Sequence, residues 1–178
     1  MKILLAFILS SFCILNAYAQ TDNFNIENGQ VVWQKVFNTD QSKEELINKI
    51  QRTGIFKNIS DNGESLTAEI QQLSLDFIGF GETEFSTPIY IARNYVNAFT
   101  LIELREGRYR VTIKNIMLTQ KYEDALSKEG EVTALELYAL RKRNTEFKPG
   151  FLKLPSKIIN YTFQNIADFT LELEEDDW

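Results

Sequence analysis

The sequence predicts an α+β domain in which helices cover one face of an antiparallel sheet. Two segments of strand-forming residues, 89–104 and 109–118, flank Glu106-Gly107, a pair typical of a two-residue hairpin turn. A capping box begins a helix after the first strand. Near the C-terminus, apolar residues recur at helical spacing.

The hairpin turn fixes which residues lie opposite each other. Arg105 lies opposite Arg108, and Glu103 lies opposite Arg110 as an exposed charge pair that contributes about 0.2–1 kcal/mol. One face of the hairpin is then apolar, with Ile102, Leu104, Tyr109, Val111 and Ile113. The other face is mostly polar and holds Glu103, Arg110, Thr112 and Lys114. We expect helices to cover the apolar face.

The first half of the chain is predicted to combine strands, one helix and turns. Ser42 caps the helix, Glu45 reaches back to complete the capping box, and Gly54 ends it. The apolar alternation changes parity at Gln71-Gln72, which predicts a β-bulge. The other predicted elements are a loose arm at 21–30, strands at 31–37 and 55–59, a turn at 61–63 and a loop at 79–88.

The C-terminal part is predicted to be helical. Segment 132–142 consists of good helix formers. Segment 155–173 has one apolar stripe, formed by Ile159, Phe163, Ile166, Thr170 and Leu173. The chain shows no internal repeat or linker, so we expect a single domain over 20–178, with a helical part at 121–173 and an acidic tail at 174–178.

Residues 1–19 have the pattern of a cleaved signal peptide. Lys2 precedes an apolar run, and Ala17 and Ala19 are the small residues that a signal peptidase reads before Gln20. A retained membrane anchor is the alternative, but a span takes about 20 apolar residues and this run is shorter. We therefore expect an exported protein, periplasmic or secreted, with no membrane span after cleavage.

Composition excludes many kinds of chemistry. The chain has no histidine, and its single cysteine, Cys13, leaves with the signal peptide. Histidine triads, cysteine nucleophiles and ordinary zinc sites are therefore excluded. The formal net charge of −6 becomes −7 once Lys2 is removed, so nucleic acid is not an expected partner.

The remaining catalytic candidates are carboxylates, and each has a simpler explanation. Glu44-Glu45 belongs to the start of a helix, and Glu82 and Glu84 lie in a polar loop. We therefore expect no catalytic residue, no metal and no cofactor, although a hydrolase that uses two carboxylates or an oxygen-bound cation stays open as an alternative.

One candidate partner surface lies on the polar face of the hairpin. Phe99 and Leu101 interrupt that face beside Thr112 and Lys114. An exposed apolar patch can mark a binding surface. The alternative is that another helix or loop covers these side chains, as is usual for apolar strand residues.

Four segments, taken in order, resemble a known family. They are Val31–Phe37, the capped helix, Thr87–Arg93 and Glu106–Ile113. Over residues 28–120 they resemble an exported bacterial domain-of-unknown-function family, typical of Bacteroidota, with a TATA-binding-protein-like (TBP-like) fold. The resemblance implies a single curved antiparallel sheet with helices on one face, and it implies no known activity.

We expect a non-enzymatic binding module of the bacterial envelope. It would use a sheet face, or the groove between sheet and helices, to hold a protein, a peptide or an apolar small molecule. The alternatives are the carboxylate- or cation-dependent hydrolase and a structural envelope-assembly subunit.

Overall fold

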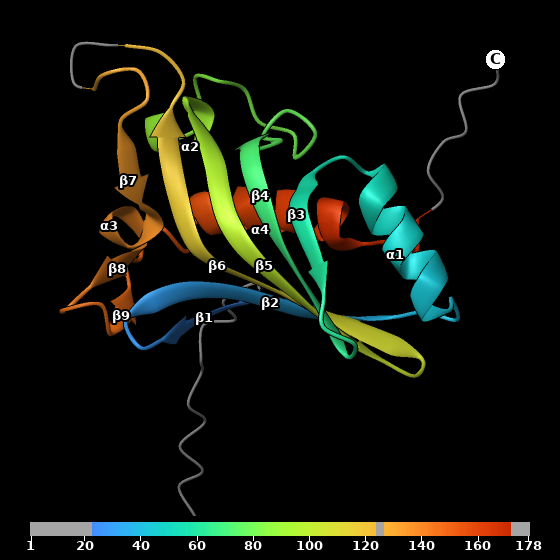
Figure 1. Ribbon diagram of the computed structural model, residues 1–178. Helices are drawn as coiled ribbons and strands as arrows, with labels where there is room; N and C mark the ends of the chain where they lie inside the picture. The colour runs from blue at the N-terminus through green and yellow to red at the C-terminus, as the bar shows by residue number, and fades with distance from the viewer. Residues whose placement is uncertain (1–22, 124–126, 172–178) are drawn as a thin grey trace, which may run out of the picture.

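The computed structural model describes residues 23–123 and 127–171 (Figure 1). The predicted signal peptide, its cleavage residues Ala17, Ala19 and Gln20, and the acidic tail lie outside the described residues.

The described chain is built on a seven-stranded antiparallel sheet with the strand order β1-β2-β6-β5-β4-β3, in which β7 also pairs with β6. A two-stranded sheet of β8 and β9 lies apart from it. The strands are β1 (Phe24–Glu27), β2 (Gln30–Asn38), β3 (Phe56–Asp61), β4 (Ser65–Ser74), β5 (Asn94–Arg105), β6 (Arg108–Gln120), β7 (Val132–Ala134), β8 (Leu140–Arg141) and β9 (Glu146–Phe147).

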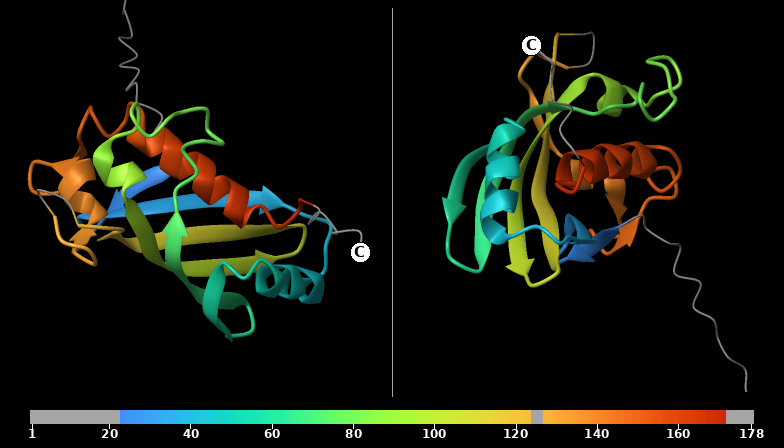
Figure 2. Two further views of the ribbon diagram at one scale, coloured as in Figure 1. Left: turned by 90° about the horizontal axis from the view of Figure 1, so that it is seen from above. Right: turned by 90° about the vertical axis from the view of Figure 1, so that its right-hand side faces the viewer.

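The sheet curves around helix α4, which lies inside the curve (Figure 2). The helices are α1 (Lys43–Arg52), α2 (Ile89–Ala92), α3 (Leu135–Ala139) and α4 (Pro155–Ala167). We call the sheet face toward α4 the inner face and the opposite one the outer face.

The core lies between α4 and the inner face. The ring of Phe163 packs edge-on against Trp33 at 5.7 Å, and the Trp33 indole donates a hydrogen bond to Asn160 at 2.9 Å. Leu46 and Ile50 of α1 belong to the same buried cluster. The expectation that helices cover one face of an antiparallel sheet is therefore confirmed.

The local predictions that rest on turn and cap chemistry are confirmed. The β5–β6 register pairs Arg105 with Arg108 and Glu103 with Arg110. Ser42 and Glu45 form a complete capping box at the start of α1. The register between β4 and β5 shifts between Ile70 and Leu73, as the predicted bulge requires.

Three predictions of element type or length are wrong. Segment 89–104 is not one strand, because Ile89–Ala92 forms the short helix α2, which follows Pro88 and precedes β5. Segment 132–142 is not one helix, because Val132–Ala134 pair with the end of β6 and only Leu135–Ala139 are helical. Helix α4 ends at Ala167, so Thr170 is exposed beyond it rather than in its stripe.

The predicted loose arm at 21–30 contains a strand. Phe24–Glu27 form β1, and Phe24 is buried against the ring of Phe151. Asn28 and Gly29 both have positive φ, as a tight turn between paired strands requires.

Strand β3 forms one edge of the sheet and is irregular. Its register against β4 shifts between Lys57 and Ser60. Asn58, within this shift, has a φ of 52° and donates a side-chain hydrogen bond to Glu69.

Candidate functional site

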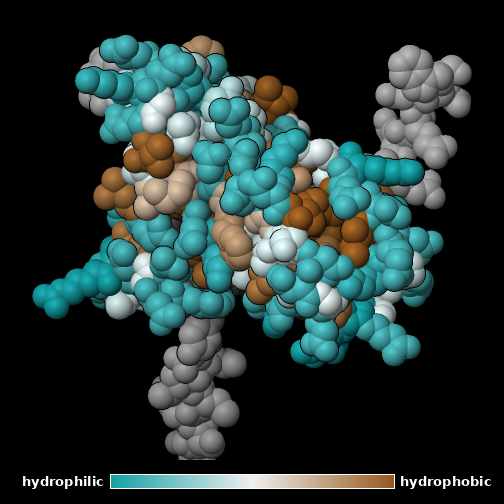
Figure 3. Space-filling view, in the orientation of Figure 1, coloured by the Kyte–Doolittle hydropathy of each residue, from teal (hydrophilic) through white to brown (hydrophobic). Residues whose placement is uncertain are grey.

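Among the described residues, no helix covers the outer face of the sheet. In Figure 1 no described helix lies in front of β3, β4 and β5, and in Figure 2 none lies outside the curve of the sheet. The space-filling view of this side is largely hydrophilic, with separate apolar areas (Figure 3). A binding function of the sheet would use this face, because the inner face is filled by the core.

The structure brings the four predicted surface residues together on the outer face. Phe99 is paired with Lys114, and Leu101 with Thr112, in neighbouring rows. The Lys114 ammonium lies 5.3 Å from the centroid of the Phe99 ring, within the range of a cation–π contact.

Exposure differs among these four residues. Phe99, Leu101 and Lys114 are half-buried. Thr112 is only 7% exposed, and its hydroxyl accepts a hydrogen bond from Gln34 at 3.0 Å. Phe99, Leu101 and Lys114 can therefore touch a partner, whereas Thr112 supports them from within the sheet.

A hollow of about 390 Å³ adjoins Phe99, and we call it the bend hollow. It lies where three strands depart from regular pairing: Gln72 and Asn115 each have a φ of 53°, and the β5–β6 register shifts between Asn97 and Phe99. Bulges of this kind bend strands and re-aim side chains. The hollow is lined by Glu69, Ile70, Gln71, Asn97, Ala98, Phe99, Asn115 and Met117.

A second hollow of about 180 Å³ lies on the outer face at the end of the β5–β6 hairpin, and we call it the arginine hollow. Three arginines line it: Arg105, Arg108 and Arg110. The other lining residues are Val36, Glu103 and Tyr109. The hairpin register predicts where these arginines lie, but the sequence pattern does not indicate a site there.

The α1 cleft, of about 690 Å³, lies between the start of α1 and the turns of the two hairpins. Its lining includes two apolar residues, Leu46 and Leu104, and charged residues of both signs: Asp40, Lys43, Glu64, Arg105 and Glu106.

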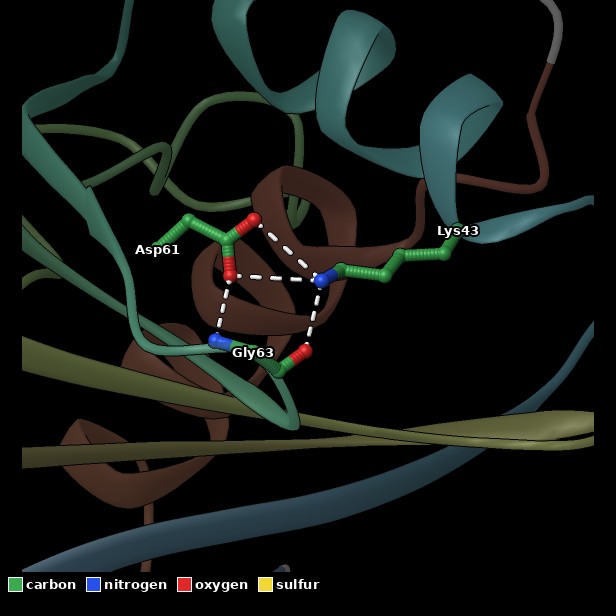
Figure 4. A network of polar contacts seen from close by, with 3 residues as sticks. All are labelled: Lys43, Asp61 and Gly63. Atoms are coloured by element: carbon green, nitrogen blue, oxygen red, sulfur yellow. Dashed lines mark hydrogen bonds and ion pairs between the residues drawn. The ribbon is translucent and has the colours of Figure 1, made fainter.

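Lys43, which lines the α1 cleft, forms polar contacts with Asp61 and Gly63 of the β3–β4 hairpin (Figure 4). Its ammonium lies 3.2 Å from the Asp61 carboxylate, which also accepts a hydrogen bond from the Gly63 N–H at 2.8 Å. The hydrogen bond from the Gly63 N–H lowers the pKa of Asp61 most, and the Lys43 ammonium lowers it further. These contacts fix α1 to the β3–β4 turn.

Two of the acidic residues predicted as catalytic candidates form contacts with neighbouring residues. Glu45 is part of the capping box, and the Ser42 N–H holds the pKa of Glu45 below its usual value. Glu84 lies 3.8 Å from Arg93. In the part of the chain that the structure describes, no group of three acidic side chains is placed to hold a metal ion.

None of the helices within residues 23–123 and 127–171 is long and apolar enough to cross a membrane.

No protein-family model matches the chain, and no curated protein matches it.

Solved structures do match the fold. A TBP-like protein from Parabacteroides distasonis is 14% identical with a TM-score of 0.52, and the match covers 82% of this chain and 94% of that one. The fold is TBP-like. A DUF4468 family protein from Bacteroides ovatus, 18% identical with a TM-score of 0.50, matches over 86% of this chain and 94% of its own.

The sequence resemblance implied a TBP-like fold, and the structural matches confirm it. At these identities the likeness concerns the fold alone, and a TBP-like fold does not define an activity.

Proposed function

We propose that this chain is a non-enzymatic binding module of the bacterial envelope that holds another protein on the outer face of its sheet. One observation supports this most directly. Phe99 and Leu101 are half-buried on a sheet face that no described helix covers. A solvated sheet face is normally polar, so apolar side chains there indicate a contact surface.

The bend hollow supports the same proposal. It gives the face a concave site directly beside the Phe99 ring. Asn97 is held there by two hydrogen bonds, one accepted from the Gln72 N–H and one donated to Thr119. A partner side chain would meet a surface that is already fixed, which lowers the entropic cost of binding.

Photo-crosslinking in the exporting cell tests the proposal. A photoreactive phenylalanine analogue replaces Leu101 in one variant and Asn165, an exposed residue of α4, in the control. We expect position 101 to give a discrete protein adduct that position 165 does not give. Equal adducts from both positions, or none from position 101, would contradict the proposal.

Export is a separate part of the proposal and has its own test. The signal-peptide pattern ending at Ala19 supports it. Mass spectrometry of the protein from the periplasmic and extracellular fractions should give a mature N-terminus at Gln20. A cytoplasmic protein that retains Met1 would contradict export.

A hydrolase is the second proposal, and the α1 cleft favours it. The cleft has a volume typical of small-molecule sites, and Asp40, Glu64 and Glu106 line it. Glu64→Gln and Glu106→Gln should then each abolish turnover of chromogenic esters or glycosides. Absence of turnover by the native chain would remove this proposal.

A further inference from the structure

Two arginines face each other at the end of the β5–β6 hairpin, and no acidic side chain of the described residues forms an ion pair with either. Arg105 and Arg108 are paired directly opposite each other, and both are exposed. Neither forms an ion pair with another described residue. Like charges directly opposite each other destabilise a pair of strands, so this pair costs the hairpin stability.

The third arginine of the hollow is neutralised and fixed. Arg110 binds Glu103 through two nitrogens, with Nε and Nη2 each 2.7 Å from a carboxylate oxygen. This forked geometry holds one wall of the hollow in place. Val36, which is 51% exposed, adds an apolar surface from β2. The hollow therefore combines two guanidinium groups that form no ion pair among the described residues with a fixed wall and exposed methyl groups.

The charge of the outer face differs in sign from that of the chain. The formal net charge of the chain is −6. On the outer face of β2 to β6, however, cations outnumber carboxylates. The cations are Lys57, Arg105, Arg108, Arg110 and Lys114, and the carboxylates are Glu69 and Glu103.

We propose that the arginine hollow binds a carboxylate of an acidic segment of the partner protein. This inference rests on the proposed function, because it names the chemistry of the protein that the outer face holds. A guanidinium group matches a carboxylate in a two-pronged geometry, and Val36 can contact the methylene groups that precede it. Nucleic acid fits less well, because the rest of this acidic chain repels a phosphate backbone.

Fluorescence anisotropy with a labelled oligoglutamate peptide and the full chain tests the inference at low salt. In the double variant Arg105→Gln/Arg108→Gln, we expect the affinity to fall about tenfold or more, as lost charge-assisted hydrogen bonds predict. The matched control is Arg52→Gln/Arg143→Gln, which removes the same charge from two exposed arginines outside the hollow. The control should change the affinity by less than about twofold.

A charge reversal separates binding from folding. Arg108→Glu places a carboxylate opposite Arg105, so we expect a higher Tm together with loss of peptide binding. An equal loss of affinity in the control double variant would overturn the inference. So would an oligothymidylate that binds as tightly as the peptide and depends equally on Arg105 and Arg108.

The two proposals can fail separately. If the adduct from position 101 persists while oligoglutamate does not bind, the acidic partner is wrong and the outer-face binding function stands. If neither the adduct nor the peptide complex forms, both proposals fail.

Discussion

The phenol oxygen of Tyr109 accepts a hydrogen bond from the Phe169 N–H at 2.8 Å. The same hydroxyl donates to the Ala167 carbonyl oxygen at 3.0 Å, and the Tyr109 and Phe169 rings stack at 5.3 Å. Burial raises the pKa of Tyr109 above its usual range, so the hydroxyl stays protonated. This contact connects strand β6 to the end of helix α4.

Tyr109→Phe should lower the free energy of unfolding by about 1–3 kcal/mol, because it leaves a buried N–H and a buried carbonyl without their partner. Urea denaturation measures this change. The control is Tyr138→Phe, whose ring stacks on Tyr90 and whose hydroxyl has no hydrogen-bond partner among the described residues. Equal losses in the two variants would contradict the role assigned to the Tyr109 hydroxyl.

Stability should depend on pH through Asp61. Its pKa is lowered in the folded chain, so its contribution is present above the pKa of the unfolded chain, about 3.9, and is lost as the pH falls through the folded value. Asp61→Asn should therefore be less stable than the native chain at neutral pH, and the difference should shrink in acid. Urea titrations across this pH range test it.

Glu129→Gln, at an exposed loop position, is the matched control for Asp61→Asn. It should change the unfolding free energy by less than about 0.5 kcal/mol. A difference between Asp61→Asn and the native chain that grew as the pH fell would show that the sign of the assigned shift is wrong.

Gly54→Ala should lower the free energy of unfolding by about 1 kcal/mol. Gly54 follows helix α1 with a φ of 64°, in the left-handed region that a side chain disfavours, although no atom lies within 4 Å of the added Cβ. Gly150→Ala is the control, because its Cβ is equally free and its φ lies outside that region. Thermal denaturation of both variants separates backbone strain from steric contact.

Phe163→Ala should lower the free energy of unfolding by about 3–5 kcal/mol, because it opens a cavity between α4 and Trp33. Phe85→Ala removes the same ring from a fully exposed loop position and should change that free energy by less than about 0.5 kcal/mol. If both variants lost a similar amount of unfolding free energy, Phe163 would not belong to the stabilising core.

The sequence predicts those parts of the fold whose causes are local. The Glu106-Gly107 turn sets the hairpin register through neighbouring residues, and the capping box lies within one turn of helix α1. Strand β7 is different: Val132–Ala134 become a strand because β6 offers free pairing positions. That partner lies at a distance in the sequence, so helix propensity gave the wrong prediction for this segment.

The candidate site also has one part that local strand pairing predicts and one part that depends on distant contacts. Strand alternation alone places Phe99 beside Lys114 on one face, and the structure places them so. The register likewise puts Arg105 opposite Arg108. Whether an acid from another segment neutralises the two arginines depends on tertiary contacts, and for this reason the sequence does not reveal the arginine hollow.

The irregular edge strand β3 has a consequence for self-association. An incoming strand from a second molecule would need a continuous row of amide and carbonyl groups along that edge. The displaced backbone at Asn58 interrupts this row. The irregularity therefore disfavours the addition of a strand from a second copy at this edge of the sheet.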